Sequence, residues 1–203
     1  MQLIGYLESP FVRRVAVTAQ YLGLPYELRQ ISIIREYDAF RKINPLVKAP
    51  TLVCDDGQIL VDSTLIIDYL ESLTGKGTLM PSDETGYIRA LNIIGTAMVA
   101  NEKTVQLIYE LKHRPVEAYH RPWEERVEQQ LNEAMILLNA AYEGCTEWLF
   151  GSEICQPDIT AAIAWYFSQL HYPDRVSAAS YPNLVSLSER AEALPEFLAC
   201  PTG

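Results

Sequence analysis

Residues 44–64, with the sequence NPLVKAPTLVCDDGQILVDST, decide the fold of the first part of the chain. Thr51–Cys54 is a short apolar run typical of a buried strand, and Gln58–Val61 is a second one. The turn sequence Asp55-Asp56-Gly57 separates them, so the two runs predict a β-hairpin. Asp62-Ser63-Thr64 then offers helix-capping side chains before an apolar run at helical spacing.

The residues before this stretch predict a strand, a helix and a second strand. Gln2–Leu7 is the first strand. Ser9-Pro10 opens the helix, with serine as the N-cap and proline at the first helical position. Tyr26–Ile33 alternates as a second strand, and Arg35–Ile43 is expected to be a loop with about one helical turn. A helix between two strands favours a parallel pair, and the hairpin adds antiparallel edges.

The first helix has one apolar face. Its members recur at helical spacing: Val12, Val15, Ala16, Ala19 and Leu22. This pattern places Arg13, Arg14 and Gln20 off the apolar face.

Residues 76–86 predict a linker between residues 1–75 and 87–203, because two glycines, a proline and small polar residues gather around them. Beyond the linker we find helical periodicity alone. The expected helices are Tyr87–His113, Trp123–Tyr142, Pro157–Leu170, Asn183–Ala193 and Pro195–Cys200. The Pro157–Leu170 segment is apolar on most sides, which predicts a buried helix. The fold class is therefore an α/β N-terminal domain followed by an all-α C-terminal domain.

Composition restricts the partners. Hydrophobic residues make up 49% of the 203 residues and the net charge is −10, which disfavours nucleic acid and anionic membranes as partners. The N-terminal residues lack a signal-peptide pattern, and no stretch of about 18 apolar residues predicts a membrane span. The four cysteines are far apart, which favours reduced thiols and a cytoplasmic location. The three histidines show no ligand spacing, so no metal is expected.

The stretch from Lys48 to Ser63 resembles the glutathione-binding half of the cytosolic glutathione transferases, and the likeness extends over nearly the whole chain. It implies a thioredoxin-like N-terminal domain, a cis bond before Pro50 and glutathione as co-substrate. In that family the residue before the cis-proline, here Ala49, pairs its backbone with the cysteinyl part of glutathione. The resemblance also implies that Asp62 and Ser63 hold the γ-glutamyl end.

Other glutathione contacts are expected from Lys48 and Phe11. Lys48 is a point charge suited to the glycine carboxylate, although a surface lysine taken alone is more often solvated. Asp62 would receive the α-ammonium group, and Ser63 at its helix start the α-carboxylate. The pair would also serve as an ordinary N-cap, and both roles are compatible.

Ser9 is the expected catalytic residue. In serine-type, bacterial-looking members a serine precedes proline at this place, and Ser9-Pro10-Phe11-Val12-Arg13 fits. A Ser-Pro pair before a helix is in most proteins only a cap. Tyr6 is a second candidate hydroxyl, because some classes use a tyrosine near the end of the first strand. Serine in place of cysteine at position 9 argues against mixed-disulfide chemistry.

The resemblance also implies an electrophile site between the domains. Its candidate residues are Phe11, Met98, Asn101, Glu102 and Tyr109. The expected function is a detoxifying transferase that activates the glutathione thiol for attack on a small electrophile, and the expected assembly is a homodimer. The alternative is a non-catalytic binding or regulatory protein with the same fold. Isomerases, dehalogenases and ether-cleaving lyases share the thiol site, and the sequence does not separate them.

Two further expectations concern the helical part. Glu124, Glu125 and Glu128 predict a solvated helix face. Family members begin the buried helix with a capping box, S/T-x-x-D. Here Cys155 stands at the cap position before Asp158, and cysteine is a poor N-cap.

Overall fold

The computed structural model describes residues 1–74 and 79–202 and divides into two compact units. The N-terminal unit comprises Met1–Leu79 together with Ala193–Gly203, and the helical unit comprises Met80–Glu192. Residues 76–78 of the predicted linker lie outside the described residues.

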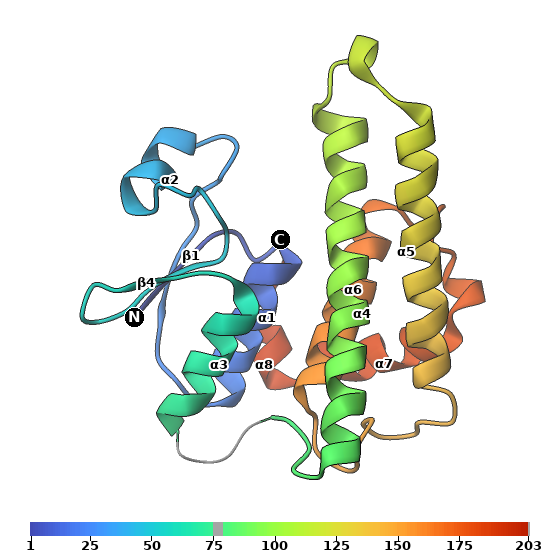
Figure 1. Ribbon diagram of the computed structural model, residues 1–203. Helices are drawn as coiled ribbons and strands as arrows, with labels where there is room; N and C mark the ends of the chain where they lie inside the picture. Colours follow the sequence, from blue (N-terminus) through green and yellow to red (C-terminus); the bar gives the residue numbers. More distant parts are fainter. Residues whose placement is uncertain (75–78, 203) are drawn as a thin grey trace. The chain divides into compact units, whose positions relative to one another are not determined.

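A four-stranded sheet forms the centre of the N-terminal unit (Figure 1). Its strands are β1 (Gln2–Ile4), β2 (Glu27–Arg29), β3 (Thr51–Val53) and β4 (Ile59–Leu60), in the order β2-β1-β3-β4. β1 and β2 are parallel because a helix connects them, and the other two pairings are antiparallel. The predicted thioredoxin-like arrangement is confirmed, although β2 is shorter than the predicted strand.

Three helices accompany the sheet: α1 (Pro10–Tyr21), α2 (Tyr37–Ile43) and α3 (Ser63–Thr74). α1 and α3 pack side by side (Figure 1). Their apolar faces form the core with β1, and Val12, Ile66 and Leu3 are each at most 1% exposed. The segment expected to be mainly loop, residues 35–43, contains the seven-residue helix α2, whose Phe40 is fully buried.

Arg13 and Arg14 depart from the prediction that they lie off the apolar face of α1. Arg13 is 3% exposed and Arg14 is 1% exposed. Both guanidinium groups have hydrogen-bond acceptors from distant segments, which offsets the cost of burying a charge. Arg13 Nε donates to the Cys200 carbonyl over 2.9 Å, and its guanidinium carbon lies 5.5 Å from the centre of the Phe197 ring.

These contacts explain why the last residues belong to the N-terminal unit. Helix α8 (Pro195–Leu198) packs against α1. Tyr26, just before β2, also places its hydroxyl 3.6 Å from the Cys200 sulfur. The sequence assigned all of residues 87–203 to the helical domain, whereas residues 193–203 cluster with the sheet.

The helical unit is built on α4 (Glu84–Ile108), which packs against α5 (Arg121–Ala141) and α6 (Gln156–His171). Short turns η1 (Tyr109–His113) and η2 (Val116–Ala118) join α4 to α5, and η3 (Ala178–Ser180) precedes α7 (Pro182–Glu192). α6 is the buried helix, as predicted. α4 begins three residues earlier than predicted, because Asp83 accepts a hydrogen bond from the backbone of Gly86.

The start of α6 forms a capping box although cysteine occupies the cap position. The carboxylate of the fully buried Asp158 accepts hydrogen bonds from the backbone N–H groups of Cys155 and Leu149, both over 3.1 Å. The Cys155 thiol also donates to Asp158 over 2.8 Å. The capping box therefore forms with cysteine in the serine position.

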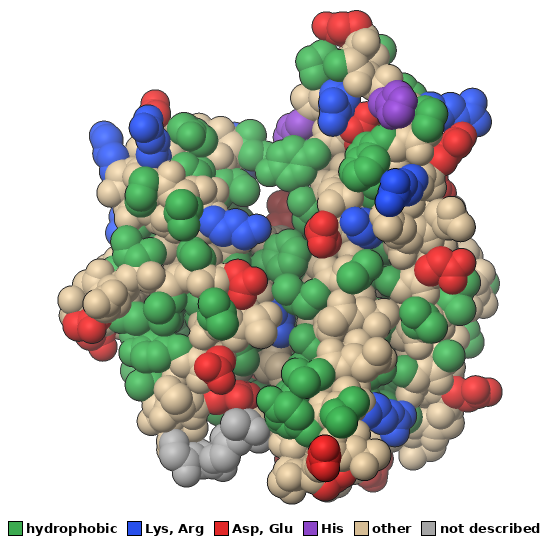
Figure 2. All heavy atoms as spheres, viewed as in Figure 1, with side chains coloured by type: hydrophobic (Ala, Val, Ile, Leu, Met, Phe, Trp, Pro, Cys, Tyr) green, Lys and Arg blue, Asp and Glu red, His purple; other side chains and the backbone are tan. Residues whose placement is uncertain are grey.

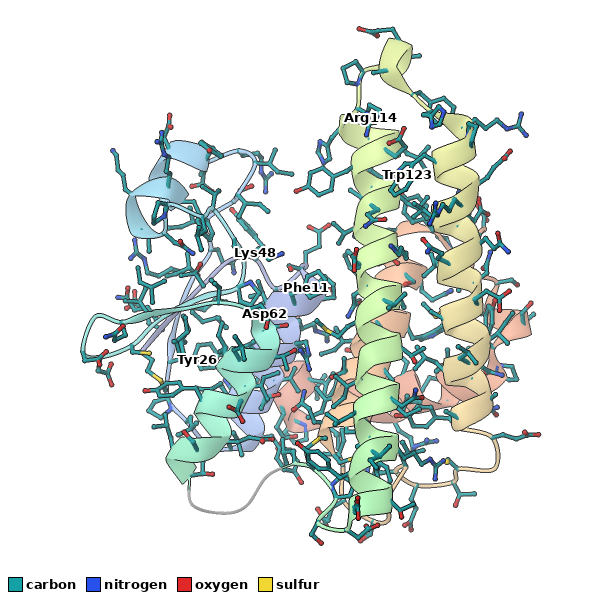
Figure 3. The ribbon with its side chains drawn as sticks, viewed as in Figure 1. Phe11, Tyr26, Lys48, Asp62, Arg114 and Trp123 are labelled. Atoms are coloured by element: carbon teal, nitrogen blue, oxygen red, sulfur yellow. The ribbon has the colours of Figure 1, made fainter. Side chains whose placement is uncertain are left out.

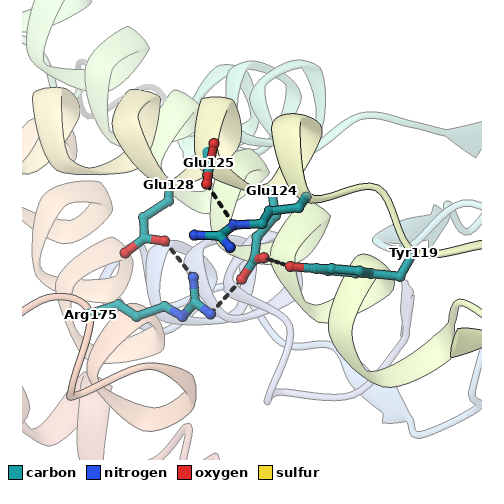
Figure 4. Close-up of polar contacts among 6 residues, drawn as sticks. Tyr119, Glu124, Glu125, Glu128 and Arg175 are labelled. Atoms are coloured by element: carbon teal, nitrogen blue, oxygen red, sulfur yellow. Dashed lines mark hydrogen bonds and ion pairs between the residues drawn. The ribbon is translucent and has the colours of Figure 1, made fainter.

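Glu124 contradicts the predicted solvated face of α5. It is 7% exposed, accepts a hydrogen bond from the Tyr119 hydroxyl and lies 2.5 Å from Arg175 (Figure 4). Arg175 also reaches Glu128 over 2.5 Å. Glu125 is the member of this group that fits the prediction, because its pair with Arg121 is exposed on both sides. The cluster ties the start of α5 to the segment after α6.

Candidate functional site

Ser9 lies where the sequence places it, at the N-cap of α1. Its backbone N–H donates to the Tyr6 carbonyl over 3.0 Å, and its carbonyl accepts from Arg13 over 2.9 Å. Its side chain makes no cap hydrogen bond, so the half-buried hydroxyl is not used to satisfy the N-terminal N–H groups of its own helix. A hydroxyl with this placement can donate to a ligand atom at the positive end of the helix dipole.

The loop before β3 is braced by two side chains. Asn44 Nδ2 donates to Thr51 Oγ1 over 2.8 Å, and Thr51 Oγ1 donates to the Lys48 carbonyl over 2.6 Å. Between them Val47 has a φ of +49°, a left-handed conformation that is unusual for a β-branched residue. The Ala49–Pro50 bond is cis, as the family resemblance implies. The hydrogen bonds of Asn44 and Thr51 fix the backbone of the loop that contains Ala49.

Gly5 allows this loop to lie close to the end of β1. A Cβ atom on Gly5 would lie 2.7 Å from Val12 Cγ2 and 3.2 Å from Ala49 Cβ, and the φ of Gly5 is +137°. The missing side chain therefore lets β1, α1 and the loop meet near Ser9. The sequence reasoning did not identify this requirement.

The aromatic residues before and after Ser9 in the sequence, Tyr6 and Phe11, each have a cationic side chain over the ring. Lys48 Nζ is 5.9 Å from the centre of the Phe11 ring, and the guanidinium carbon of Arg35 is 5.5 Å from the centre of the Tyr6 ring. Figure 3 shows Lys48, Phe11 and Asp62 gathered on one part of the N-terminal unit.

Asp62 and Ser63 form the start of α3. Asp62 Oδ1 accepts from the backbone of Thr64 over 2.9 Å and of Leu65 over 3.3 Å, so the predicted N-cap is present. Asp62 is exposed, whereas Ser63 is 1% exposed. The Ser63 hydroxyl accepts a hydrogen bond from Arg14 over 3.0 Å, and the two residues are too far apart in the sequence for a local pattern to pair them.

Comparison with known proteins bears on the same residues. The family model described as "Glutathione S-transferase, N-terminal domain" matches residues 3–77. A glutathione S-transferase from Methylobacterium radiotolerans, solved in complex with glutathione sulfonate, is 26% identical with a TM-score of 0.89, covering 98% of this chain and 93% of that one. The matched family model covers most of the N-terminal unit, and this solved structure extends the likeness over nearly the whole chain. A glutathione transferase family member from Pseudomonas fluorescens with bound glutathione is 25% identical, with a TM-score of 0.85 and coverage of 100% and 98%.

Curated relatives match this chain over different lengths. The maleylacetoacetate isomerase of Pseudomonas aeruginosa is 27% identical over 97% of this chain and 93% of its own length. Glutathione S-transferase U4 of Arabidopsis thaliana is 30% identical over 83 residues, which are 41% of this chain and 37% of that protein. The relatives therefore include both transferases and isomerases.

Three of the candidate electrophile residues, Met98, Asn101 and Glu102, lie in α4, and Tyr109 is the first residue of η1. Their burial differs. Glu102 and Tyr109 are exposed, Met98 is half-buried, and Asn101 is fully buried. Neither polar atom of the Asn101 amide has a hydrogen-bond partner among the described residues. Phe11 belongs to the N-terminal unit and is half-buried.

Residues 1–74 and 79–202 contain no group of three or more His, Cys, Asp or Glu side chains arranged to hold a metal ion. The four cysteines are free thiols. Within the same residues, no helix is both long enough and apolar enough to cross a membrane.

Proposed function

We propose that this protein is a glutathione transferase of the serine type. The observation that carries the proposal is the Ser9 hydroxyl, which stands at a helix N-terminus without capping that helix. In the same unit, the Lys48–Pro50 loop and the exposed carboxylate of Asp62 supply groups that suit a tripeptide with two carboxylates and one ammonium group. A non-catalytic interaction protein would need none of these features.

In this proposal each end of glutathione has its own contact. Lys48 pairs with the glycine carboxylate, the backbone of Ala49 with the cysteinyl part, and Phe11 lies beside it. Asp62 receives the α-ammonium group and the start of α3 at Ser63 receives the α-carboxylate. The proposed contacts of the electrophile are Met98, Asn101 and Glu102 of α4 and Tyr109 of η1.

Ser9 would act on the thiol. A free thiol has a pKa of about 8.5, so only a few per cent is thiolate at pH 7. Lowering this pKa by about two units requires roughly 2.7 kcal/mol of extra stabilisation of the thiolate. One hydroxyl donor together with the helix dipole supplies an effect of this size. The reaction is then attack of the thiolate sulfur on a small electrophile.

The test is glutathione binding measured by calorimetry, followed by a conjugation assay with a generic aromatic electrophile. We expect binding in the micromolar to millimolar range and conjugation that depends on glutathione. The proposal fails if no heat of binding is detected at millimolar glutathione. Binding without turnover would favour the non-catalytic alternative.

We also propose that the protein is a homodimer. Apolar side chains gather over the first turns of α4 (Figure 2), where Tyr87, Ile88 and Leu91 are exposed. An open groove of about 760 Å³ lies between α4 and α5, and its apolar lining includes Leu91 and Leu137. Exposed apolar surface of this kind is typical of an interface.

Light scattering at micromolar concentration should report twice the chain mass. Leu137→Glu should shift the protein toward monomer, whereas Val116→Glu, at an exposed position outside the groove, should not. A wild-type monomer would refute the proposed assembly.

A further inference from the structure

Arg14 connects α1, which begins next to Ser9, to the first residues of α3. Its Nη1 donates to the Ser63 hydroxyl and to the Thr64 hydroxyl, each over 3.0 Å. Burial lowers the pKa of the Arg14 guanidinium to about 10, while the nearby charge of Asp62 raises it, so the group remains a cation at neutral pH. A fixed positive charge therefore lies beneath the start of α3.

The chemistry of the three side chains sets the direction of their hydrogen bonds. A guanidinium group can donate but cannot accept. The hydroxyls of Ser63 and Thr64 must therefore accept from Arg14, and each keeps its single proton to donate elsewhere. Thr64 is exposed, so its proton is the more accessible to a solute, whereas Ser63 is 1% exposed. Oriented donors above a buried cation suit a carboxylate.

We propose that Arg14 is a positioning residue for the γ-glutamyl end of bound glutathione, where it commits the Ser63 and Thr64 hydroxyls to donate toward the α-carboxylate. This inference rests on the proposed function and adds to it two residues, Arg14 and Thr64, that the sequence did not select. Asp62, which caps the same turn, keeps its role as acceptor for the α-ammonium group.

Arg13 provides a matched comparison. It is also buried in α1, but its Nε donates to the Cys200 carbonyl of the C-terminal segment instead of the start of α3. Replacing either arginine by methionine removes a buried cation and its hydrogen bonds from the same helix. Arg14→Met should alter recognition of one ligand group, whereas Arg13→Met should alter stability without a preference among ligand groups.

The experiment measures the dissociation constants of two ligands by calorimetry. One ligand is glutathione. The other is γ-aminobutyryl-cysteinyl-glycine, in which a hydrogen replaces the α-carboxylate of glutathione and the amino group is kept. For Arg14→Met we expect glutathione affinity to fall at least about tenfold and that of the analogue less than about threefold. Arg14→Lys should recover part of the loss, and Arg13→Met should change both affinities by the same factor.

A further readout separates this role from that of Ser9. The thiol pKa of bound glutathione, followed by its ultraviolet absorbance, should be the same in Arg14→Met and wild type. Equal loss of affinity for both ligands in Arg14→Met would overturn the inference, because it would indicate a general effect on the fold.

If Arg14→Met does not fold, Thr64→Val keeps the shape of the side chain and removes its hydroxyl. It should show the same preference, with glutathione weakened more than the analogue, and equal affinities to wild type for both ligands would overturn the inference. Failure of wild type to bind glutathione would instead remove the proposed function itself. The two failures are therefore distinguishable.

Discussion

Helices α1 and α6 begin in different ways, although each has a possible capping residue at its start. At α6, Asp158 accepts hydrogen bonds from the backbone of Leu149 and Cys155 and from the Cys155 thiol. At α1, the Ser9 side chain makes no cap hydrogen bond. A helix start whose donors are satisfied from within stabilises the fold, whereas an uncapped N-terminus with a nearby hydroxyl keeps its capacity to bind an anion.

The largest expected effect is on the start of α6. Asp158→Ala leaves the N–H groups of Leu149 and Cys155 buried without this acceptor, so the free energy of unfolding should fall by about 3 kcal/mol. Urea unfolding followed by circular dichroism measures it. Asp158→Asn, which keeps a side-chain oxygen, should lose less. A change below about 0.5 kcal/mol in the alanine variant would show that the box is not important for stability.

The start of α3 should behave as an intermediate case, because Asp62 is both a cap and a proposed ligand contact. Asp62→Ala should weaken glutathione binding by about 1.5–3 kcal/mol, the usual value for a charge-assisted hydrogen bond. Asp62→Asn keeps a capping oxygen and should retain stability while it loses affinity. Calorimetry that finds wild-type affinity in both variants would exclude Asp62 from the site.

Glu124 is a buried carboxylate that has no proposed ligand, and its expected role is in stability alone. The hydrogen bond from Tyr119 and the contact with Arg175 lower the pKa of Glu124 below its ordinary value of 4.5, although burial opposes them. Its contribution to stability is therefore present above that value and is lost as pH falls through the lower pKa of the folded state. Glu124→Gln should cost about 1 kcal/mol at pH 7 and progressively less below pH 4.5.

Glu125→Gln is the control for Glu124→Gln, because its pair with Arg121 is exposed and should contribute little at any pH. Unfolding curves at several pH values compare the two. A Glu124→Gln deficit that stays constant at low pH would contradict the ionic account of this cluster.

The smallest effect is expected at Cys155. Cys155→Ser should raise the free energy of unfolding by about 0.5–1 kcal/mol, because serine is a better N-cap and its hydroxyl can donate to Asp158. Thermal unfolding measures the change, and Cys145→Ser, at a half-buried position outside the box, is the control. A lower melting temperature for Cys155→Ser would mean that the thiol is needed for packing.

Local patterns predicted most of the fold. The hairpin, the parallel pair and the buried helix follow from turn residues and apolar periodicity, which depend on neighbours along the chain. The predicted β2 was longer than the observed strand, and the predicted helical turn was shorter than α2. The lengths of short elements depend on tertiary contacts such as the burial of Phe40.

The candidate site was harder to predict where it depends on distant partners. Arg14 and Ser63 are 49 residues apart, and Arg13 and Cys200 are 187 apart, so no local pattern pairs them. Apolar periodicity counts every arginine as polar, so it predicts a buried arginine to be on the surface. Glu124 was missed for the same reason, because its partner Arg175 is 51 residues away.

The most direct test of the account is an ultraviolet titration of the glutathione thiolate bound to wild type and to Ser9→Ala. In wild type the thiol pKa should lie about two units below the free value of ~8.5. In Ser9→Ala it should return most of the way to that value while glutathione affinity stays nearly intact, because Lys48, Asp62 and Ser63 are unchanged. Identical titration curves for the two proteins would contradict the central claim and make Tyr6 the next candidate.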